Sequence, residues 1–237
     1  MKDAPAQTVH LKDYRTFPFR IERAELTFRL DPAATRVHSR LQITPLDKLS
    51  DLQLDGEELT LLSLSVDGQE VEAVHRSQTA EGLRVARAAL PGGSFDLTCE
   101  VEIAPESNTA LEGLYISRGI YTTQCEAQGF RRITYYPDRP DVLAPFRVRI
   151  EAPADSAPVL LSNGNPAGSG PGWAEWHDPW PKPAYLFALV AGDLRAMRDS
   201  FTTRSGREVA LAVWVRPGDE DRCGWALESL KTAMRWD

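Results

Sequence analysis

The segment from Tyr121 to Asp141 stands out in this 237-residue sequence, because it places polar, charged and aromatic residues between two clear strand patterns. Within it, Gln124 and Glu126 are two positions apart. On an extended backbone, residues two apart point to the same side, so the amide and the carboxylate would face one space. A carboxylate and an amide oxygen can jointly accept hydrogen bonds from a cationic amine. The pair is therefore a candidate amine-binding site.

A structural role for Glu126 is the competing interpretation. Arg131 and Arg132 follow it closely in the sequence. Either guanidinium could hold the carboxylate in an ordinary ion pair, and spacing alone favours that arrangement. Both interpretations stay open when only the residues are considered.

Other catalytic and metal-binding patterns do not occur in the sequence. No Gly-x-Ser-x-Gly elbow, phosphate-binding loop, dinucleotide fingerprint or His-Glu-x-x-His zinc helix is present. We interpret the histidines as surface or structurally satisfied residues; they are His10, His38, His75 and His177. We therefore predict no catalytic residue and no metal ligand in this chain.

Three tryptophans, Trp173, Trp176 and Trp180, form a second feature that could bind a ligand. Aromatic platforms can stack on sugars or exposed bases. Because Trp173 and Trp176 are three apart, they would lie on opposite faces of a strand, and this favours packing over binding. A carbohydrate-binding sandwich that uses Trp173 and Trp180 is the alternative, and glycan titration followed by tryptophan fluorescence would test it.

The elements that must position these residues are predicted by period-two alternation of apolar and polar residues, which indicates strands with one buried face. It is clearest over 24–31, 95–103 and 146–151. Further strands are expected at Arg36–Thr44, Leu59–Val66, Pro158–Ser162, Trp173–Trp176 and Tyr185–Val190. Many short strands separated by turn residues predict a mainly β fold of stacked antiparallel sheets, such as a β-sandwich.

The pattern changes near Asp199. Phe201–Arg204 and Val209–Val215 are expected to form a hairpin, and Asp219-Glu220-Asp221 is expected to open a helix. That helix would carry an apolar stripe that needs a partner; the stripe consists of Ala226, Leu230, Ala233 and Met234. We therefore expect a β domain over residues 1–198 and the truncated beginning of a second domain over residues 199–237.

Composition restricts the partners and the compartment. Lys and Arg total 27 against 34 Asp and Glu, and the net charge of −7 argues against nucleic acid or an anionic membrane as the main partner. The amino terminus offers no apolar core for a signal peptide, and no apolar stretch is long enough to span a bilayer. The three cysteines form no disulfide framework. A cytoplasmic protein with reduced thiols is expected.

Several blocks of the sequence resemble, in order and spacing, the bacterial aminopeptidase N family. The blocks are NTALEGLY (Asn108–Tyr115), TQCEAQGFRRITYYPDRPDVLAPF (Thr123–Phe146), LLSNGN (Leu160–Asn165), DPWPKPAYLFALVAGDL (Asp178–Leu194) and FTTRSGREVAL (Phe201–Leu211). The resemblance extends from about Tyr14 to the last residue. The sequence departs from the bacterial pattern at Arg132, where His is common, and at Pro137, where Leu is common.

The resemblance implies a saddle-like, mostly antiparallel β domain that precedes a thermolysin-like catalytic domain. Such enzymes remove the amino-terminal residue from peptides with a zinc-activated water. In the family's Gln-x-Glu-Ala motif the glutamate binds the substrate's α-ammonium and the glutamine lines the pocket for the first side chain; these roles fall on Glu126 and Gln124. The family's zinc-binding helix lies beyond the last residue here, so the resemblance implies zinc only in the full-length enzyme and no peptide hydrolysis by this chain alone.

Two expectations about partners complete the hypothesis. The apolar faces of the carboxy-terminal hairpin and helix would pack against the catalytic domain, so we expect the chain alone to self-associate through them. The alternative function is a non-catalytic β scaffold, since some relatives have lost the zinc motif. A Gly-Ala-Met-Glu-Asn block and a zinc helix encoded just past Asp237 would favour the enzyme.

Overall fold

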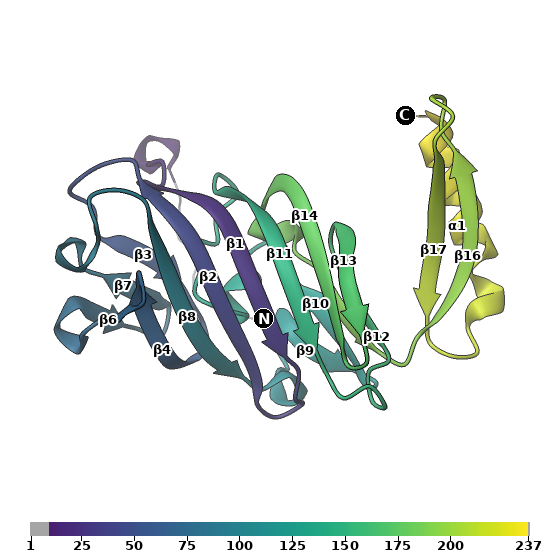
Figure 1. Cartoon of the computed structure of the whole chain (residues 1–237), viewed down its shortest axis with the longest axis horizontal. Coiled ribbons are helices and arrows are strands. Elements are labelled where there is room, and N and C mark those ends of the chain that lie inside the picture. Colours follow the sequence, from purple (N-terminus) through teal and green to yellow (C-terminus); the bar gives the residue numbers. More distant parts are fainter. Residues whose placement is uncertain (1–9, 237) are drawn as a thin grey trace.

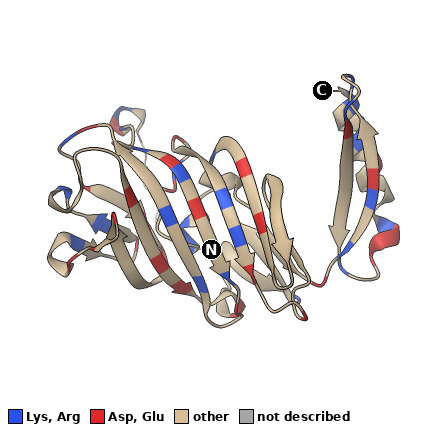
Figure 2. Ribbon diagram, in the orientation of Figure 1, with Lys and Arg blue, Asp and Glu red and all other residues tan. Residues whose placement is uncertain are grey.

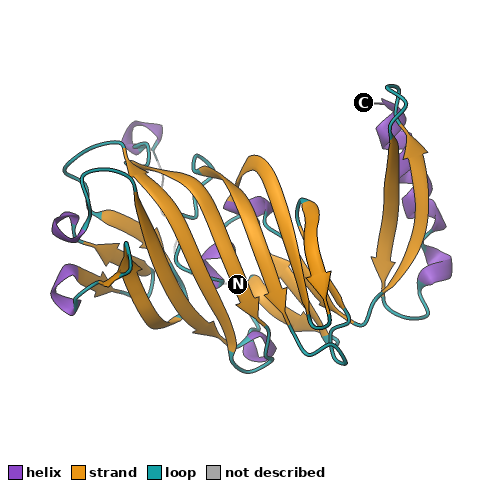
Figure 3. Cartoon of the chain, in the orientation of Figure 1, coloured by secondary structure: helices purple, strands orange, loops and turns teal. Residues whose placement is uncertain are grey.

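The structure is a computed structural model that describes residues 10–236. The predicted absence of a signal peptide concerns the amino-terminal residues, of which 1–9 lie outside this range. Asp237 also lies outside it. Strands dominate the chain (Figure 3), which confirms the predicted mainly β fold. None of the helices within residues 10–236 has the length and apolar character needed to cross a membrane.

The largest element is an eight-stranded sheet in the order β13-β14-β11-β1-β2-β8-β4-β5. Its strands are β1 (Phe19–Arg29), β2 (Thr35–Pro45), β4 (Thr60–Val66), β5 (Gln69–Glu70), β8 (Phe95–Ile103), β11 (Leu143–Glu151), β13 (Asn165–Gly170) and β14 (Trp173–Pro183). Neighbouring strands are antiparallel except β1 and β11, which run parallel. The sheet is therefore mostly antiparallel, as the resemblance implies, with one parallel pair.

The two faces of this sheet differ as the alternation in the sequence predicts. The outward face carries acidic and basic side chains on neighbouring strands (Figure 2), and ion pairs such as Arg40–Asp96 at 2.6 Å connect them. The inward face is apolar, with Leu26, Phe28 and Val148 all buried. Burying that face is the main free-energy gain that holds the layers together.

Two smaller sheets cover the inward face (Figure 1). A four-stranded sheet, in the order β12-β15-β10-β9, contains β9 (Gly113–Ser117), β10 (Ile120–Gln124), β12 (Val159–Ser162) and β15 (Leu189–Gly192). A three-stranded sheet contains β3 (Leu52–Asp55), β6 (Arg76–Gln78) and β7 (Gly82–Val85). One continuous apolar core includes side chains from all three sheets.

Short 3-10 helices connect several strands. They are η1 (Leu11–Asp13), η2 (Ala73–His75), η3 (Arg87–Ala89), η4 (Pro105–Ser107), η5 (Phe130–Arg132), η6 (Ala184–Leu186) and η7 (Glu220–Arg222). η6 corrects the expected strand at Tyr185–Val190, because β15 begins only at Leu189. The chain must pass here from β14 in the large sheet to β15 in the four-stranded sheet, and the 3-10 turn makes that crossing.

The carboxy-terminal part is a two-stranded sheet of β16 (Arg195–Thr202) and β17 (Glu208–Val215) with α1 (Gly224–Trp236). Figure 1 shows this unit standing apart from the large sheet. β16 starts six residues earlier than Phe201, where the hairpin was expected, and crosses the proposed boundary between residues 198 and 199. Because residues 195–200 lack a clear alternation, their sequence gave no strand signal.

The start of the helix also differs from the expectation. The acidic run at 219–221 lies in or beside η7, where Arg222 N–H and Cys223 N–H donate to carbonyls three residues earlier. The first α-helical hydrogen bond of this region runs from Leu227 N–H to the Cys223 carbonyl at 3.1 Å. The helix therefore begins at Gly224 rather than at the carboxylates. Its expected apolar stripe is largely exposed, since Ala226, Leu230 and Ala233 all face solvent.

Candidate functional site

Gln124 and Glu126 lie where β10 ends and the chain turns back. Gln124 is the last residue of β10 and pairs with Gly113 of β9. The turn after it is closed by a hydrogen bond from Gly129 N–H to the Cys125 carbonyl at 2.8 Å. A side chain at residue 129 would place its Cβ 2.3 Å from the Gln124 carbonyl oxygen, so only glycine fits this close approach. Glu126 is therefore in a tight turn, and not in the extended segment that was expected.

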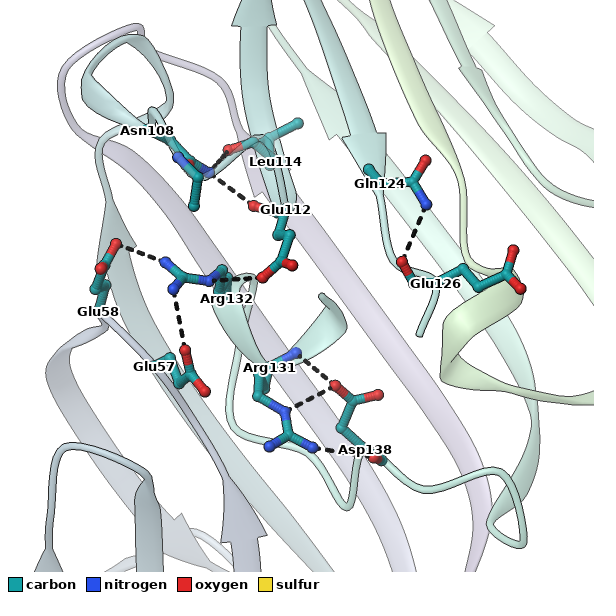
Figure 4. Close-up of polar contacts among 11 residues, drawn as sticks. Glu57, Glu58, Asn108, Glu112, Leu114, Gln124, Glu126, Arg131, Arg132 and Asp138 are labelled. Atoms are coloured by element: carbon teal, nitrogen blue, oxygen red, sulfur yellow. Dashed lines mark hydrogen bonds and ion pairs between the residues drawn. The ribbon is translucent and has the colours of Figure 1, made fainter. Parts of the chain in front are cut away.

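Buried residues on either side fix the turn to the core. Cys125 and Phe130 are both buried, and the Phe130 ring lies 5.0 Å from the Tyr136 ring and 5.2 Å from the Phe187 ring. Gln124 and Glu126, between or beside these anchors, are exposed. Figure 4 shows both side chains extending in the same direction from the turn. The Gln124 and Glu126 side chains therefore lie on the same side, as predicted, although a turn and not a strand places them there.

The polar groups of this pair are arranged as acceptors. Gln124 Nε2 donates to the Glu126 backbone carbonyl at 3.1 Å, which leaves Gln124 Oε1 directed away from that bond (Figure 4). Within the part of the chain that the structure describes, the Glu126 carboxylate has no hydrogen bond or ion pair. An exposed carboxylate next to an oriented amide oxygen can bind a primary ammonium, which has three donors.

The two arginines that could have neutralised Glu126 bind other carboxylates. Arg131 Nε donates to Asp138 Oδ2 at 3.1 Å, and the Arg131 backbone N–H donates to the same oxygen. Burial raises the pKa of Asp138, while the bonds from Arg131 oppose that increase. Arg132 donates to Glu58 at 2.7 Å and to Glu57 at 3.0 Å. The structural interpretation of Glu126 as a partner of Arg131 or Arg132 is therefore wrong.

Comparison with known proteins identifies the family of this domain. Residues 20–186 match the model of the Peptidase M1 N-terminal domain. The chain belongs to this family. The chain is 53% identical to "Aminopeptidase N" of Caulobacter vibrioides, covering 100% of this chain and 28% of that protein. It is 47% identical to "Aminopeptidase N" of Escherichia coli, covering 98% of this chain and 27% of that protein. The chain thus spans less than a third of the length of these curated relatives.

Solved structures give the same relationship. The chain superposes with a TM-score of 0.89 and 36% identity on Legionella pneumophila aminopeptidase A in complex with aspartic acid, covering 96% of this chain and 27% of that chain. It superposes with a TM-score of 0.71 and 21% identity on an M1 zinc metallopeptidase from Deinococcus radiodurans, covering 85% of this chain and 48% of that chain. The second similarity shows the fold alone.

Whether this chain could bind zinc depends on the donor side chains that it brings together. Among residues 10–236, no three His, Cys, Asp or Glu side chains gather in a way that could hold a metal ion. The described residues therefore do not fit a zinc site.

The tryptophans of the M1 domain have structural contacts. Trp176 packs against the core and donates from Nε1 to the Leu160 carbonyl at 3.1 Å, while the Arg149 guanidinium lies 4.4 Å from the Trp173 ring. The predicted placement of Trp173 and Trp176 on opposite faces of the strand is confirmed, because Trp176 pairs with inward-facing Val148 and Trp173 pairs with Glu151. Trp180 is 77% exposed.

The acidic group around Arg132 was not anticipated from the sequence. Glu57 and Glu58 lie more than seventy residues before Arg132, and Glu112 lies in a third segment. No local pattern connects residues so far apart, because only the pairing of sheets brings their loops together. The departure from the family pattern at Arg132 was the only sign that this position differs.

Proposed function

We propose that this chain is the amino-terminal part of a zinc aminopeptidase that removes amino-terminal residues from peptides. In this proposal Glu126 binds the α-ammonium of the substrate and Gln124 lines the pocket for the first side chain. The observation that carries the proposal is the exposed Glu126 carboxylate, which lies beside the Gln124 amide in a family of peptidase domains and has no partner among the described residues.

The chemistry of the pair explains how such a site would select chain ends. A free α-ammonium carries a positive charge and three donors, which a carboxylate and an amide oxygen can accept together. An internal peptide nitrogen is neutral and has one donor, so it would leave the Glu126 charge uncompensated in a closed pocket. Selection for free amino termini follows from that difference in binding free energy.

The proposal assigns the reaction itself to another part of the longer protein. Zinc, which activates water for attack on a carbonyl in metallopeptidases, would bind in the portion that this chain does not span. The residues described here would bind and orient the substrate, and the chain alone would not hydrolyse peptides. A cytoplasmic location belongs to the same proposal and is supported by Cys99, Cys125 and Cys223, which are buried and free.

The exposed face of α1 supports a further part of the proposal. Leu227 is buried, whereas Ala226, Leu230 and Ala233 are exposed. We propose that the catalytic domain of the longer protein covers this face, and that the chain alone self-associates through it. Light scattering at increasing concentration tests the second statement, and a monomer at all concentrations would count against it.

Kinetics of the full-length protein on an aminoacyl p-nitroanilide test the amine-binding role. Glu126→Ala should cost about 2–5 kcal/mol, the range for removing one member of a buried charge pair, or roughly 30-fold to several-thousand-fold in kcat/KM. Glu70→Gln is the matched control, because Glu70 is an exposed glutamate in β5 at the edge of the large sheet. If Glu126→Ala keeps the kcat/KM of the control, the role of Glu126 is wrong.

A further inference from the structure

Arg132 is an arginine with three carboxylates around it, at the end of the helical turn that follows the Glu126 turn. Its side chain is only 7% exposed. NH1 donates to Glu58 Oε2 at 2.7 Å and NH2 donates to Glu57 Oε2 at 3.0 Å. Nε lies 3.5 Å from Glu112 Oε2, an ion-pair distance without a hydrogen bond (Figure 4). One guanidinium thus compensates acidic groups from the β3–β4 loop and from the segment before β9.

The backbone around Arg132 connects this cluster to the candidate amine site. Gly113, which pairs with Gln124, lies so close to Arg132 that a Cβ on Gly113 would be 2.7 Å from the Arg132 Cβ. Arg132 N–H donates to the Gly129 carbonyl at 3.1 Å, at the other end of the turn that contains Glu126. Both ends of the turn therefore contact either Arg132 or the residue packed against it.

We infer that Arg132 is a positioning residue for the amine site, an assignment that rests on the proposed function. It acts through Gly113 and Gly129 and touches no substrate. Without the guanidinium, Glu57, Glu58 and Glu112 would repel one another at close range. The segment that carries Glu112 and Gly113 would then separate from η5. The pairing of Gly113 with Gln124 would loosen, and the turn would no longer hold Glu126 in one place.

Amide hydrogen exchange on this chain tests the structural half of the inference. In Arg132→Met, exchange at the Gly129 N–H should rise about tenfold, because local opening of the turn breaks its bond to Cys125. Arg132→Lys keeps the charge and should restore part of the protection. Glu70→Gln is the matched control, since Glu70 is an exposed glutamate in β5, outside the group of carboxylates around Arg132, and its Gly129 exchange should stay normal. Unchanged exchange at Gly129 in Arg132→Met would overturn the inference.

A second variant keeps the test decisive if Arg132→Met does not fold. Glu112→Gln removes the negative charge next to Gly113 and leaves the guanidinium paired with Glu57 and Glu58. Because this pair is long and Glu112 is exposed, its effect on Gly129 exchange should be smaller, about twofold, but in the same direction. Equal exchange in Glu112→Gln and in the control Glu70→Gln would contradict the inference.

A double-mutant cycle in the full-length protein tests the functional half. If Arg132 acts through the amine site, Arg132→Met should lower kcat/KM about tenfold. The same change in a Glu126→Ala background should lower it no further, because the group that it positions is gone. Losses that multiply would show that Arg132 only stabilises the fold. That result removes the positioning role alone, whereas a normal kcat/KM in the single variant Glu126→Ala removes the proposed function itself.

Discussion

Phe130 connects the candidate site to the core, and its replacement by alanine is the sharpest test of how the turn is held. The side chain is 0% exposed. Its ring makes edge contacts with Tyr136 at 5.0 Å, Phe187 at 5.2 Å and Phe146 at 6.0 Å. Phe130→Ala removes all three contacts and leaves a cavity among these rings.

The expected loss can be compared with the stability of a domain of this size. Removing a fully buried phenylalanine costs about 3–5 kcal/mol, which includes the lost transfer free energy and the cavity. With a urea m-value of about 3 kcal/mol/M for a chain of this length, a loss of about 4 kcal/mol lowers the unfolding midpoint by about 1.3 M. Coincident circular dichroism and tryptophan fluorescence transitions would justify the two-state treatment.

Trp180→Ala is the control, because that ring is 77% exposed. Its free energy of unfolding should change by no more than about 0.5 kcal/mol. A midpoint shift below about 0.3 M for Phe130→Ala, or a shift equal to that of Trp180→Ala, would refute the anchoring role of Phe130.

Two further predictions concern charged groups near the core. Lys182 Nζ lies 2.9 Å from Asp178 Oδ2 and 4.1 Å from the centre of the Phe146 ring. Lys182→Met leaves Asp178 uncompensated and should lower the free energy of unfolding in urea by about 3 kcal/mol. Adding Asp178→Asn should recover part of this loss, and no recovery would contradict the pairing. Hydrogen bonds from Arg139 lower the pKa of Asp141 to about 2, so its stabilisation should be fully present above about pH 4 and lost as the pH falls from about 4 to about 2. Solvent screening limits this contribution to the free energy of unfolding to about 1 kcal/mol. Asp141→Asn should abolish the loss of stability between about pH 4 and about pH 2 that Asp141 causes, whereas the exposed control Asp155→Asn should leave it unchanged.

The strands that the sequence predicted best are those with one buried and one wet face. β8 matches its predicted range of 95–103, and β2 and β4 match within one residue at each end. In β8 and β2 every second side chain is buried, so the sequence pattern and the structure follow from the same cause, whereas β4 alternates only in its second half. β16 was predicted poorly because residues 195–200 are mostly exposed or half-buried, and no alternation results.

The pairing of distant strands was not predictable in the same way. β1 and β11 are parallel neighbours although more than a hundred residues separate them. The sequence of each strand specifies which face is buried, but it does not specify which strand lies beside it or in which direction. That choice depends on how the whole set of strands fills the sheet.

For the candidate site, the sequence by itself determined the residue types, Gln124 and Glu126, and through the resemblance the role that we propose for them. The tight turn itself was not predicted, because the close approach that requires glycine at 129 beside Gln124 is visible only in the structure. Tertiary structure alone decided that Arg131 and Arg132 bind Asp138, Glu57 and Glu58 and leave Glu126 exposed. Electrostatic partners are selected by distance in space, and distances between loops are set only when the sheets that carry them have packed.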